Sequence, residues 1–196
     1  MTLTFVKNIL FFLIILVGTG CAVDREDQAQ EFERRFLCNA EEVNHEKWSF
    51  SEANNKNIWF QNIDARTNEK AFSGQFSTLL SPEKPYAFTT IVDSILPDDY
   101  IQIKIWRNSE FNEGVLAVDG GNGFYDASKA VLQQGENGWE QLFMEIFIPP
   151  DFQSGKLKIY AWNNGKGKVY FDDLEIIHHR NKKYPVYDSL PGLTLY

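Results

Sequence analysis

The stretch WEQLFMEIFIPPDFQSGKLKIYAWNNGKGKVYFDDLEII, residues 139–177, decides the fold of this chain. Aliphatic residues and methionine occupy every second position over 142–148, and aliphatic residues do so again over 157–161, and this period of two indicates half-buried strands. Turn residues follow both runs, Pro-Pro-Asp at 149–151 and Asn-Asn-Gly at 163–165. A third alternating run ends the stretch. Short strands joined by such turns predict part of an antiparallel β-sandwich.

The same pattern recurs along most of the chain. In YIQIKIW, residues 100–106, three isoleucines fall on one face, and helical periodicity is scarce elsewhere. Further strands are expected at about 57–63, 73–80, 86–92, 114–119 and 122–126. No alternation of strands with helices is visible, so the sequence predicts an all-β protein, a two-sheet antiparallel β-sandwich. Residues 37–177, about 140 in number, suffice for one such domain.

The N-terminal residues have the features of a targeting segment. Residues 1–20 contain Lys7, the apolar run ILFFLIILV and then small residues, which predicts a cleaved signal peptide. Cys21 follows these small residues directly, and this order resembles the lipidation site of bacterial lipoproteins. A retained membrane anchor is the alternative. Residues 21–36 are charged and predict a flexible acidic tether, similar to the segment after the lipidated Cys in Bacteroidota surface lipoproteins. The expected location is therefore the outer membrane, facing the cell surface or the periplasm.

The charge of the chain argues against nucleic-acid binding, and its cysteine content argues against an internal disulfide bond. The net charge of −8 repels phosphate backbones and argues against nucleic-acid binding. Lipidation of Cys21 would leave Cys38 alone, so no internal disulfide is expected, and Cys38 is predicted to be a small buried apolar residue. Residues 178–196, basic and then Pro-containing, are expected to form a C-terminal extension.

Four segments in order carry a family resemblance: KAFSGQFS at 70–77, LPDDY with IWR over 96–107, Gly138-Trp139, and VYFDDLEI at 169–176. Together they resemble galactose-binding-like jelly rolls, a group that includes carbohydrate-binding modules of the cellulose- and xylan-binding type. The opening motif of that group is only faintly present, at residues 39–42. The resemblance covers nearly all of residues 37–177 and implies a jelly-roll sandwich.

The resemblance also implies a structural calcium ion at one edge of the sandwich. Its expected ligands are Glu41 or Glu42, the main chain from Lys70 to Ser73, and Asp172 with Asp173 as the alternative. Calcium takes six to eight oxygen ligands of these kinds. The competing interpretation is that Asp172 caps a turn or accepts backbone hydrogen bonds.

Aromatic and lysine side chains on the strand faces opposite the aliphatic ones are the candidate ligand-binding residues. A flat ring can pack against the C–H face of a sugar, while neighbouring polar groups bind its hydroxyls. The competing interpretation is that tryptophans of a sandwich pack in its core, with lysine stems covering them. The candidates are Trp106, Trp162, Tyr160, Tyr86, Tyr125 and Lys104.

No catalytic motif is present in the sequence, and no residue is predicted to be catalytic. The resulting hypothesis is non-catalytic binding of a polysaccharide or oligosaccharide by a membrane-anchored surface lipoprotein. The alternative is a protein-binding or adhesion module of the same fold in a surface complex. A small lyase or hydrolase is a third and weaker hypothesis, which would require two facing carboxylates or a Lys or Tyr base in a cleft.

Overall fold

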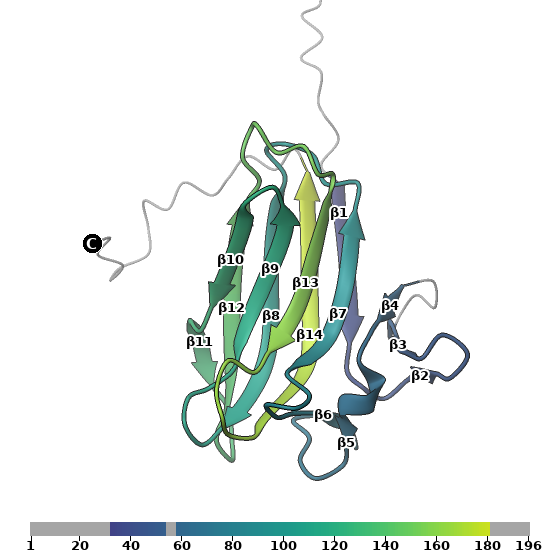
Figure 1. Ribbon diagram of the computed structural model, residues 1–196, viewed down its shortest axis with the longest axis vertical. Helices are drawn as coiled ribbons and strands as arrows, with labels where there is room; N and C mark the ends of the chain where they lie inside the picture. Colours follow the sequence, from purple (N-terminus) through teal and green to yellow (C-terminus); the bar gives the residue numbers. More distant parts are fainter. Residues whose placement is uncertain (1–31, 54–57, 181–196) are drawn as a thin grey trace, which may run out of the picture.

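The computed structural model describes residues 32–53 and 58–180, which form an all-β protein with one short 3-10 helix (Figure 1). The elements are β1 Phe32–Cys38, β2 Val43–Asn44, β3 Ser49–Ser51, β4 Trp59–Phe60, η1 Ile63–Ala65, β5 Arg66–Thr67, β6 Ser77–Leu80, β7 Tyr86–Asp93, β8 Tyr100–Ser109, β9 Val115–Gly121, β10 Phe124–Ser128, β11 Val131–Gln134, β12 Trp139–Phe147, β13 Lys156–Trp162 and β14 Val169–Arg180.

Two antiparallel sheets face each other and make the sandwich (Figure 1). The larger is seven-stranded, with the order β11-β12-β8-β14-β6-β5 and with β1 also paired to β14. The smaller has the order β10-β9-β13-β7. A third small sheet, β2-β3-β4, lies beside β7. The predicted two-sheet sandwich is therefore confirmed.

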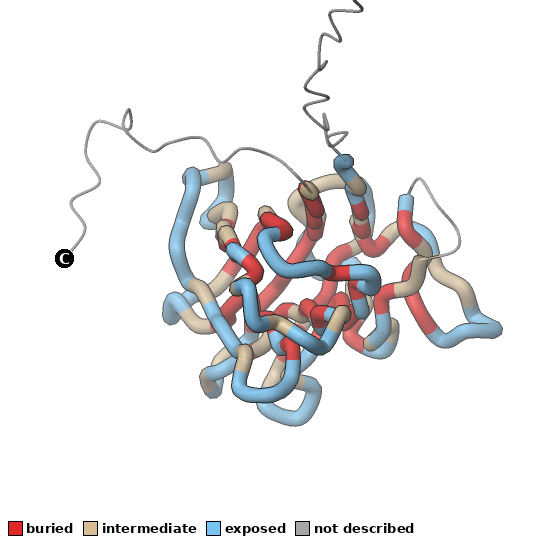
Figure 2. Tube along the Cα trace, turned by 90° about the horizontal axis from the view of Figure 1, so that it is seen from above, coloured by how far each residue is buried: buried red, intermediate tan, exposed pale blue. Residues whose placement is uncertain are grey.

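The alternating apolar residues of the sequence meet between the two sheets. Ile101, Ile103 and Ile105 of β8 are fully buried and share one core cluster with Leu157 and Ile159 of β13. Seen from above, the buried residues lie in the middle of the molecule and the exposed loops surround them (Figure 2). Cys38 is 1% exposed in this core, which confirms the prediction, and burial raises the pKa of its thiol far above the ordinary value.

The sandwich extends beyond both boundaries that the sequence suggested. β1 begins at Phe32, within the stretch expected to be a tether, and pairs with β14 over all seven residues up to Cys38. β14 continues to Arg180, three residues into the expected C-terminal extension. The domain is thus 32–180 in the structure. The expected signal peptide, Cys21, most of the tether and the rest of the extension lie outside the described residues.

Three consecutive charged residues hid β1 from the sequence interpretation. Arg35 on the outer side of β1 lies 3.3 Å from Glu175 of β14, while Phe36 on the other side is buried in the core.

In the described residues, no helix has the length and apolarity needed to cross a membrane.

Candidate functional site

Three strands of the four-stranded sheet place aromatic rings on its outer face. Because Leu157, Ile159 and Ala161 of β13 face the core, Tyr160 and Trp162 face outward. We call the group that they form with two neighbouring tyrosines the aromatic platform. It consists of Tyr125 from β10, Tyr160 and Trp162 from β13, and Tyr86 from β7.

Strand register brings the platform residues into contact. Trp162 lies opposite Tyr86, and the rings of Tyr86 and Tyr160 meet edge to face with centroids 5.6 Å apart. On the other side, the side chain of Tyr125 is near enough to Tyr160 to add to the raised pKa of Tyr160. On the intervening strand β9, Ala117 lies opposite Tyr160 and Asp119 lies opposite Tyr125, and Ala117 is a small residue that is fully buried outside the core cluster. The rings therefore form a row across the sheet from β10 to β7.

The outer rings of this row are open to solvent. Tyr86 and Tyr125 are 45% and 53% exposed, whereas Tyr160 and Trp162 are partly exposed. Burial raises the pKa of Tyr160 to about 12, and Tyr125 and the charge of Asp119 add to the effect. The Tyr160 hydroxyl therefore keeps its proton at neutral pH and can donate a hydrogen bond to a ligand.

Charged residues stand next to the platform on the same face. Lys158 lies opposite Asp119 of β9 and Ile91 of β7, and its ammonium group is 5.2 Å from the Tyr160 ring centroid. Asp119 is exposed and accepts a hydrogen bond from the Gly121 N–H. A ligand on this face would meet apolar rings and both signs of charge.

Two hollows continue the face beside the platform. One of about 240 Å³ lies over Asp119 and Lys158, and a second of about 470 Å³ lies between β7 and the segment that contains Trp59 and Gln61. Both hollows are lined by Ile91 and Lys158, so they adjoin one another. Together with the platform they make the candidate site.

The small sheet supplies the far wall of the second hollow. The Gln61 N–H donates to the Thr89 carbonyl of β7 over 2.7 Å, and the Thr90 hydroxyl donates to the Trp59 carbonyl over 3.1 Å. Lys47 lies 4.2 Å from the centroid of the Trp59 ring. Trp59 is thus a partly exposed aromatic residue that the sequence analysis did not select, because β4 is only two residues long and shows no alternation.

Trp106 and Lys104 do not join the platform, because β8 belongs to the other sheet. Trp106 is only 9% exposed, and the Phe72 ring stacks on it with centroids 3.8 Å apart. Lys104 stands on the same outer face of the seven-stranded sheet, 3.6 Å from Glu175. The structure therefore brings four of the six candidate ligand residues together and separates these two from them.

The candidate metal ligands gather around the segment 70–77, where β14 has a bulge. Asp172 is fully buried and accepts hydrogen bonds from the N–H groups of Phe72, Ser73 and Asp173 at 2.8, 3.2 and 2.8 Å. Glu41 accepts from Gln75 and Phe76 at 2.7 and 2.8 Å. Both carboxylates therefore accept hydrogen bonds from backbone N–H groups. For Asp172, this agrees with the competing interpretation of the sequence.

Burial, with a smaller contribution from their mutual charges, raises the pKa values of the buried carboxylates of this cluster. Burial raises the pKa of Asp172 to about 7, and the charge of Asp173 adds to this, against the three N–H groups that lower it. Burial also raises the pKa of Asp173, which the Glu41 charge reinforces. A divalent cation would relieve this repulsion, and carboxylates and carbonyls are donors that suit calcium.

Other expected ligands lie less favourably for a metal. Glu42 is exposed, the Lys70 carbonyl accepts the Ser77 hydroxyl, and the Lys70 ammonium binds Asn108 at 3.2 Å. Within residues 32–53 and 58–180, no three His, Cys, Asp or Glu side chains form a ready metal-binding group. The oxygen donors are of the types that bind calcium, but these side chains do not form a coordination shell for the ion.

No known protein family matches this chain, and no curated protein does. Solved structures with similar backbones include a xylan-binding domain of Xyn10C from Paenibacillus barcinonensis, with 13% identity, a TM-score of 0.45, and coverage of 71% of this chain and 90% of that one. Another is a family 16 carbohydrate-binding module, with 16% identity, a TM-score of 0.40, and coverage of 61% and 84%. An apo cyclase from Fischerella sp. is similar too, with 13% identity, a TM-score of 0.42, and coverage of 74% and 82%.

Carbohydrate-binding modules are thus among the structures similar to this chain, as the sequence resemblance led us to expect, but enzymes are among them as well. At these identities and TM-scores, the likeness says nothing about the ligand of this chain.

Proposed function

We propose that this protein binds carbohydrate without catalysis, on the outer face of the four-stranded sheet. The observation that carries the proposal is the aromatic platform, in which three strands place four rings in one row. Aromatic rings that face solvent on a regular sheet offer flat apolar surface at little entropic cost. The C–H faces of pyranose rings match such a surface.

Polar groups around the platform provide the second half of sugar recognition. The Tyr160 hydroxyl donates, the Asp119 carboxylate accepts, and Lys158 donates, all within the same face. The adjoining hollow of about 470 Å³ has a size common among small-ligand sites. Its lining includes Gln61 and Thr89 as further hydroxyl partners.

Native gel electrophoresis in gels that contain soluble polysaccharides tests the proposal. We expect at least one glucan, xylan, mannan or galactan to retard the protein, and Trp162→Ala and Tyr86→Ala to weaken binding by about tenfold or more. Trp48→Ala is the matched control, because Trp48 is 63% exposed on the turn between β2 and β3, away from the platform.

Unchanged retardation of both platform variants would contradict the assignment of the site. If no glycan from a broad array binds, and a platform variant instead disrupts capture of a defined protein partner, the protein-binding alternative replaces this one. Absence of catalysis is checked separately: we expect no new reducing ends after prolonged incubation with each retarding polysaccharide.

We also propose a structural calcium ion between Glu41, Asp172 and Asp173. Support comes from the placement of these carboxylates around the segment 70–77, where burial and, secondarily, the neighbouring carboxylate charges raise the pKa values of both aspartates. Millimolar calcium should raise the melting temperature by several degrees through preferential binding to the folded state, and a chelator should reverse the effect. Asp173→Asn should abolish the shift, whereas Asp126→Asn on the exposed strand β10 should keep it. A melting temperature that calcium does not change would contradict the proposed calcium ion.

Finally, we propose that the chain is a lipoprotein of the outer membrane, anchored through Cys21. The support is the sequence alone: an apolar run, small residues and then a cysteine. Expression in a bacterium fed an alkyne fatty acid should label the wild-type protein but not Cys21→Ser, and the labelled protein should sediment with outer membranes. Equal labelling of both proteins would overturn this part.

A further inference from the structure

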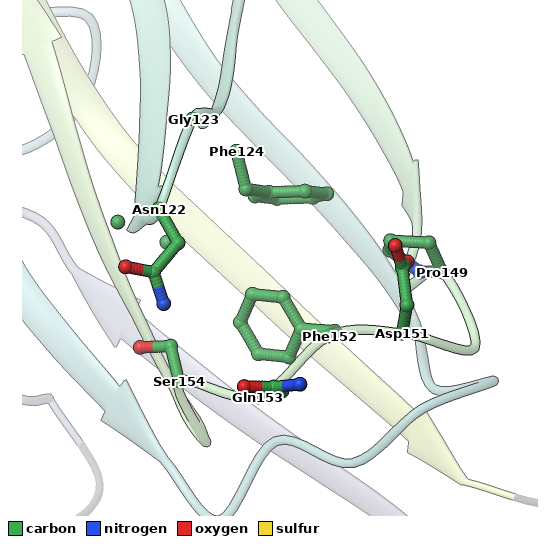
Figure 3. A pocket seen from close by; sticks show the side chains of 10 residues that line it. Asn122, Gly123, Phe124, Pro149, Asp151, Phe152, Gln153 and Ser154 are labelled. Carbon is green, nitrogen blue, oxygen red and sulfur yellow. The ribbon is translucent and has the colours of Figure 1, made fainter.

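A separate cavity of about 600 Å³ lies at one end of the sandwich, outside the platform (Figure 3). One wall is the tight turn between β9 and β10, with Asn122 and Gly123. The other wall is the segment from Pro149 to Ser154 that joins β12 to β13. The volume of this cavity falls in the range of small-ligand sites.

Two aromatic rings lie side by side in this cavity. Phe124 and Phe152 meet edge to face with centroids 5.2 Å apart, and both are only partly buried. Gly120 permits this arrangement, since a Cβ there would stand 2.7 Å from the Phe152 ring and 2.8 Å from the Phe124 ring. The rings thus close the end of the core and expose apolar surface to the cavity.

Polar side chains surround the rings. Asn122, Asp151, Gln153 and Ser154 line the cavity, and Figure 3 shows Asn122 on one side of the rings and Asp151 on the other. The amides both donate and accept hydrogen bonds, and Asp151 accepts them. Its ten lining residues contain no Lys, Arg or His, so an anionic ligand would meet Asp151 without a compensating positive charge.

The cavity adjoins the candidate site on the sheet. The hollow over Asp119 and Lys158 is also lined by Gly120, Gly121 and Ser154, three residues that line the end cavity too. At Gly121 and Gly123 a Cβ would meet nothing within 4 Å, which leaves this passage open. A ligand chain on the platform can therefore continue over the β9–β10 turn.

We propose that the end cavity is a second sugar subsite, which takes one uncharged sugar residue of a glycan whose neighbouring residues lie on the sheet face. The sugar packs on the exposed surface of Phe124 and Phe152, and its hydroxyls bind Asn122, Gln153 and Asp151. This inference rests on the proposed function for its ligand class. It adds a preference for neutral over acidic sugars at this position.

Amide chemical shifts of the isotope-labelled protein, titrated with methyl glycosides, test the subsite. The probes are the methyl glycosides of glucose, galactose, mannose and xylose, with methyl glucuronide as the charged probe. We expect at least one neutral glycoside to shift the amides of residues 121–124 and 153–154, and methyl glucuronide to bind about tenfold more weakly.

Variants locate the binding. The double variant Asn122→Gly with Gln153→Ala should weaken the neutral glycoside about tenfold, because it removes two polar contacts. Glycine suits position 122, where φ is 49°. Gln133→Ala, on the exposed strand β11, is the control for a surface amide and should leave these shifts unchanged.

The outcomes separate this inference from the proposed function. Absence of shifts at 121–124 with every neutral glycoside overturns the subsite, even if polysaccharide gels still show Trp162-dependent binding. Equal or tighter binding of methyl glucuronide overturns the neutral preference. Shifts that the double variant removes support the subsite, even if no polysaccharide retards the protein on the platform.

Discussion

At the scale of single residues, Gly74 shows how one backbone position holds two segments together. Its φ is +62°, and a Cβ there would stand 2.3 Å from Glu41 Oε1, the oxygen that accepts the N–H groups of Gln75 and Phe76. We expect Gly74→Ala to lower the free energy of unfolding by about 2–4 kcal/mol, because it adds strain and displaces a charged acceptor.

Gly123→Ala is the matched control for this substitution. Its φ is +85°, but a Cβ there meets nothing within 4 Å, so only the backbone strain of about 1 kcal/mol applies. Urea denaturation of both variants gives the comparison. Equal losses would show that the Glu41 contact contributes nothing.

Trp106 follows the competing interpretation of the sequence, in which tryptophans of a sandwich are packed away from solvent. The segments IKIW at 103–106 and YAW at 160–162 both end in a tryptophan. The Phe72 ring nevertheless covers Trp106, and a Cβ at Gly135 would stand 2.7 Å from the Trp106 ring. We expect Trp106→Ala to cost about 3–5 kcal/mol of stability, the range for large buried aromatic residues, and to leave glycan retardation intact. Trp162→Ala should show the opposite: a smaller loss of stability and weaker binding. Binding that depends on Trp106 in the folded variant would contradict this assignment.

Alternation along a strand predicts which side chains share a face, and it placed Tyr160 and Trp162 correctly on the side opposite Leu157. It cannot tell which sheet a strand joins or which loop covers an outer face, since both depend on contacts distant in sequence. Phe72 lies 34 positions before Trp106 and in no strand. For that reason, the sequence could not show that Lys104 and Trp106 lie on the other sheet, apart from the platform.

At the scale of elements, a buried polar cluster fastens the ends of β1 and β14. His178 is fully buried, its Nε2 lies 2.7 Å from Asp99, and Arg34 of β1 donates to its Nδ1. Arg180 donates to the other carboxylate oxygen of Asp99 at 3.0 Å. With Nδ1 as acceptor, the proton of the neutral ring stays on Nε2 and is donated to Asp99.

Both shifted groups in this cluster make the fold less stable in acid. Burial lowers the pKa of His178, more than Asp99 raises it, and the charges of Arg34 and Arg180 contribute. Burial alone would raise the pKa of Asp99, but hydrogen bonds from Arg180, Leu96 and His178 hold it below the ordinary value. Stability from His178 is therefore complete above about pH 6.5 and is lost as the pH falls through its lower folded pKa.

We expect the free energy of unfolding to fall between pH 7 and pH 5, with a slope of at most about 1.4 kcal/mol per pH unit from this histidine. His178→Gln should flatten the slope, because it removes the titrating group and keeps a polar side chain. Asp172 acts in the opposite sense, since its raised pKa favours acid, so the measured quantity is the difference between wild type and variant in urea titrations. Parallel pH profiles of the two proteins would exclude His178 as the source.

At the scale of the whole molecule, the long alternating strands β7, β8, β9, β12, β13 and β14 could be predicted, and they form most of both sheets. β1, β2, β3, β5 and β11 could not, for reasons of length and charge. FERRFLC carries three charges in seven residues, and VLQQ of β11 is exposed throughout. Such strands are set by the neighbour that they pair with, and only the assembled sheet contains that information.

The boundaries of the folded unit follow from the same pairing and can be tested with fragments. The range that the sequence suggested, 37–177, deletes Phe36 from the core and removes Arg34 and His178 from the polar cluster. Asp99, which is 1% exposed, would then be left buried without His178 or Arg180. Loss of a buried aromatic side chain alone costs about 3–5 kcal/mol.

We therefore expect fragment 32–180 to unfold cooperatively in urea, and fragment 37–177 to be less stable by more than about 4 kcal/mol or to remain unfolded. Fragment 32–180 with Phe32→Ala serves as the control for a change at the chain end, because Phe32 is 41% exposed and outside the core cluster. It should lose far less stability than the shorter fragment. If fragment 37–177 matched the longer one in urea, residues 32–36 of β1 would not be needed for the core, and the burial of Phe36 and the polar contacts of His178 would contribute little to the stability of the sandwich.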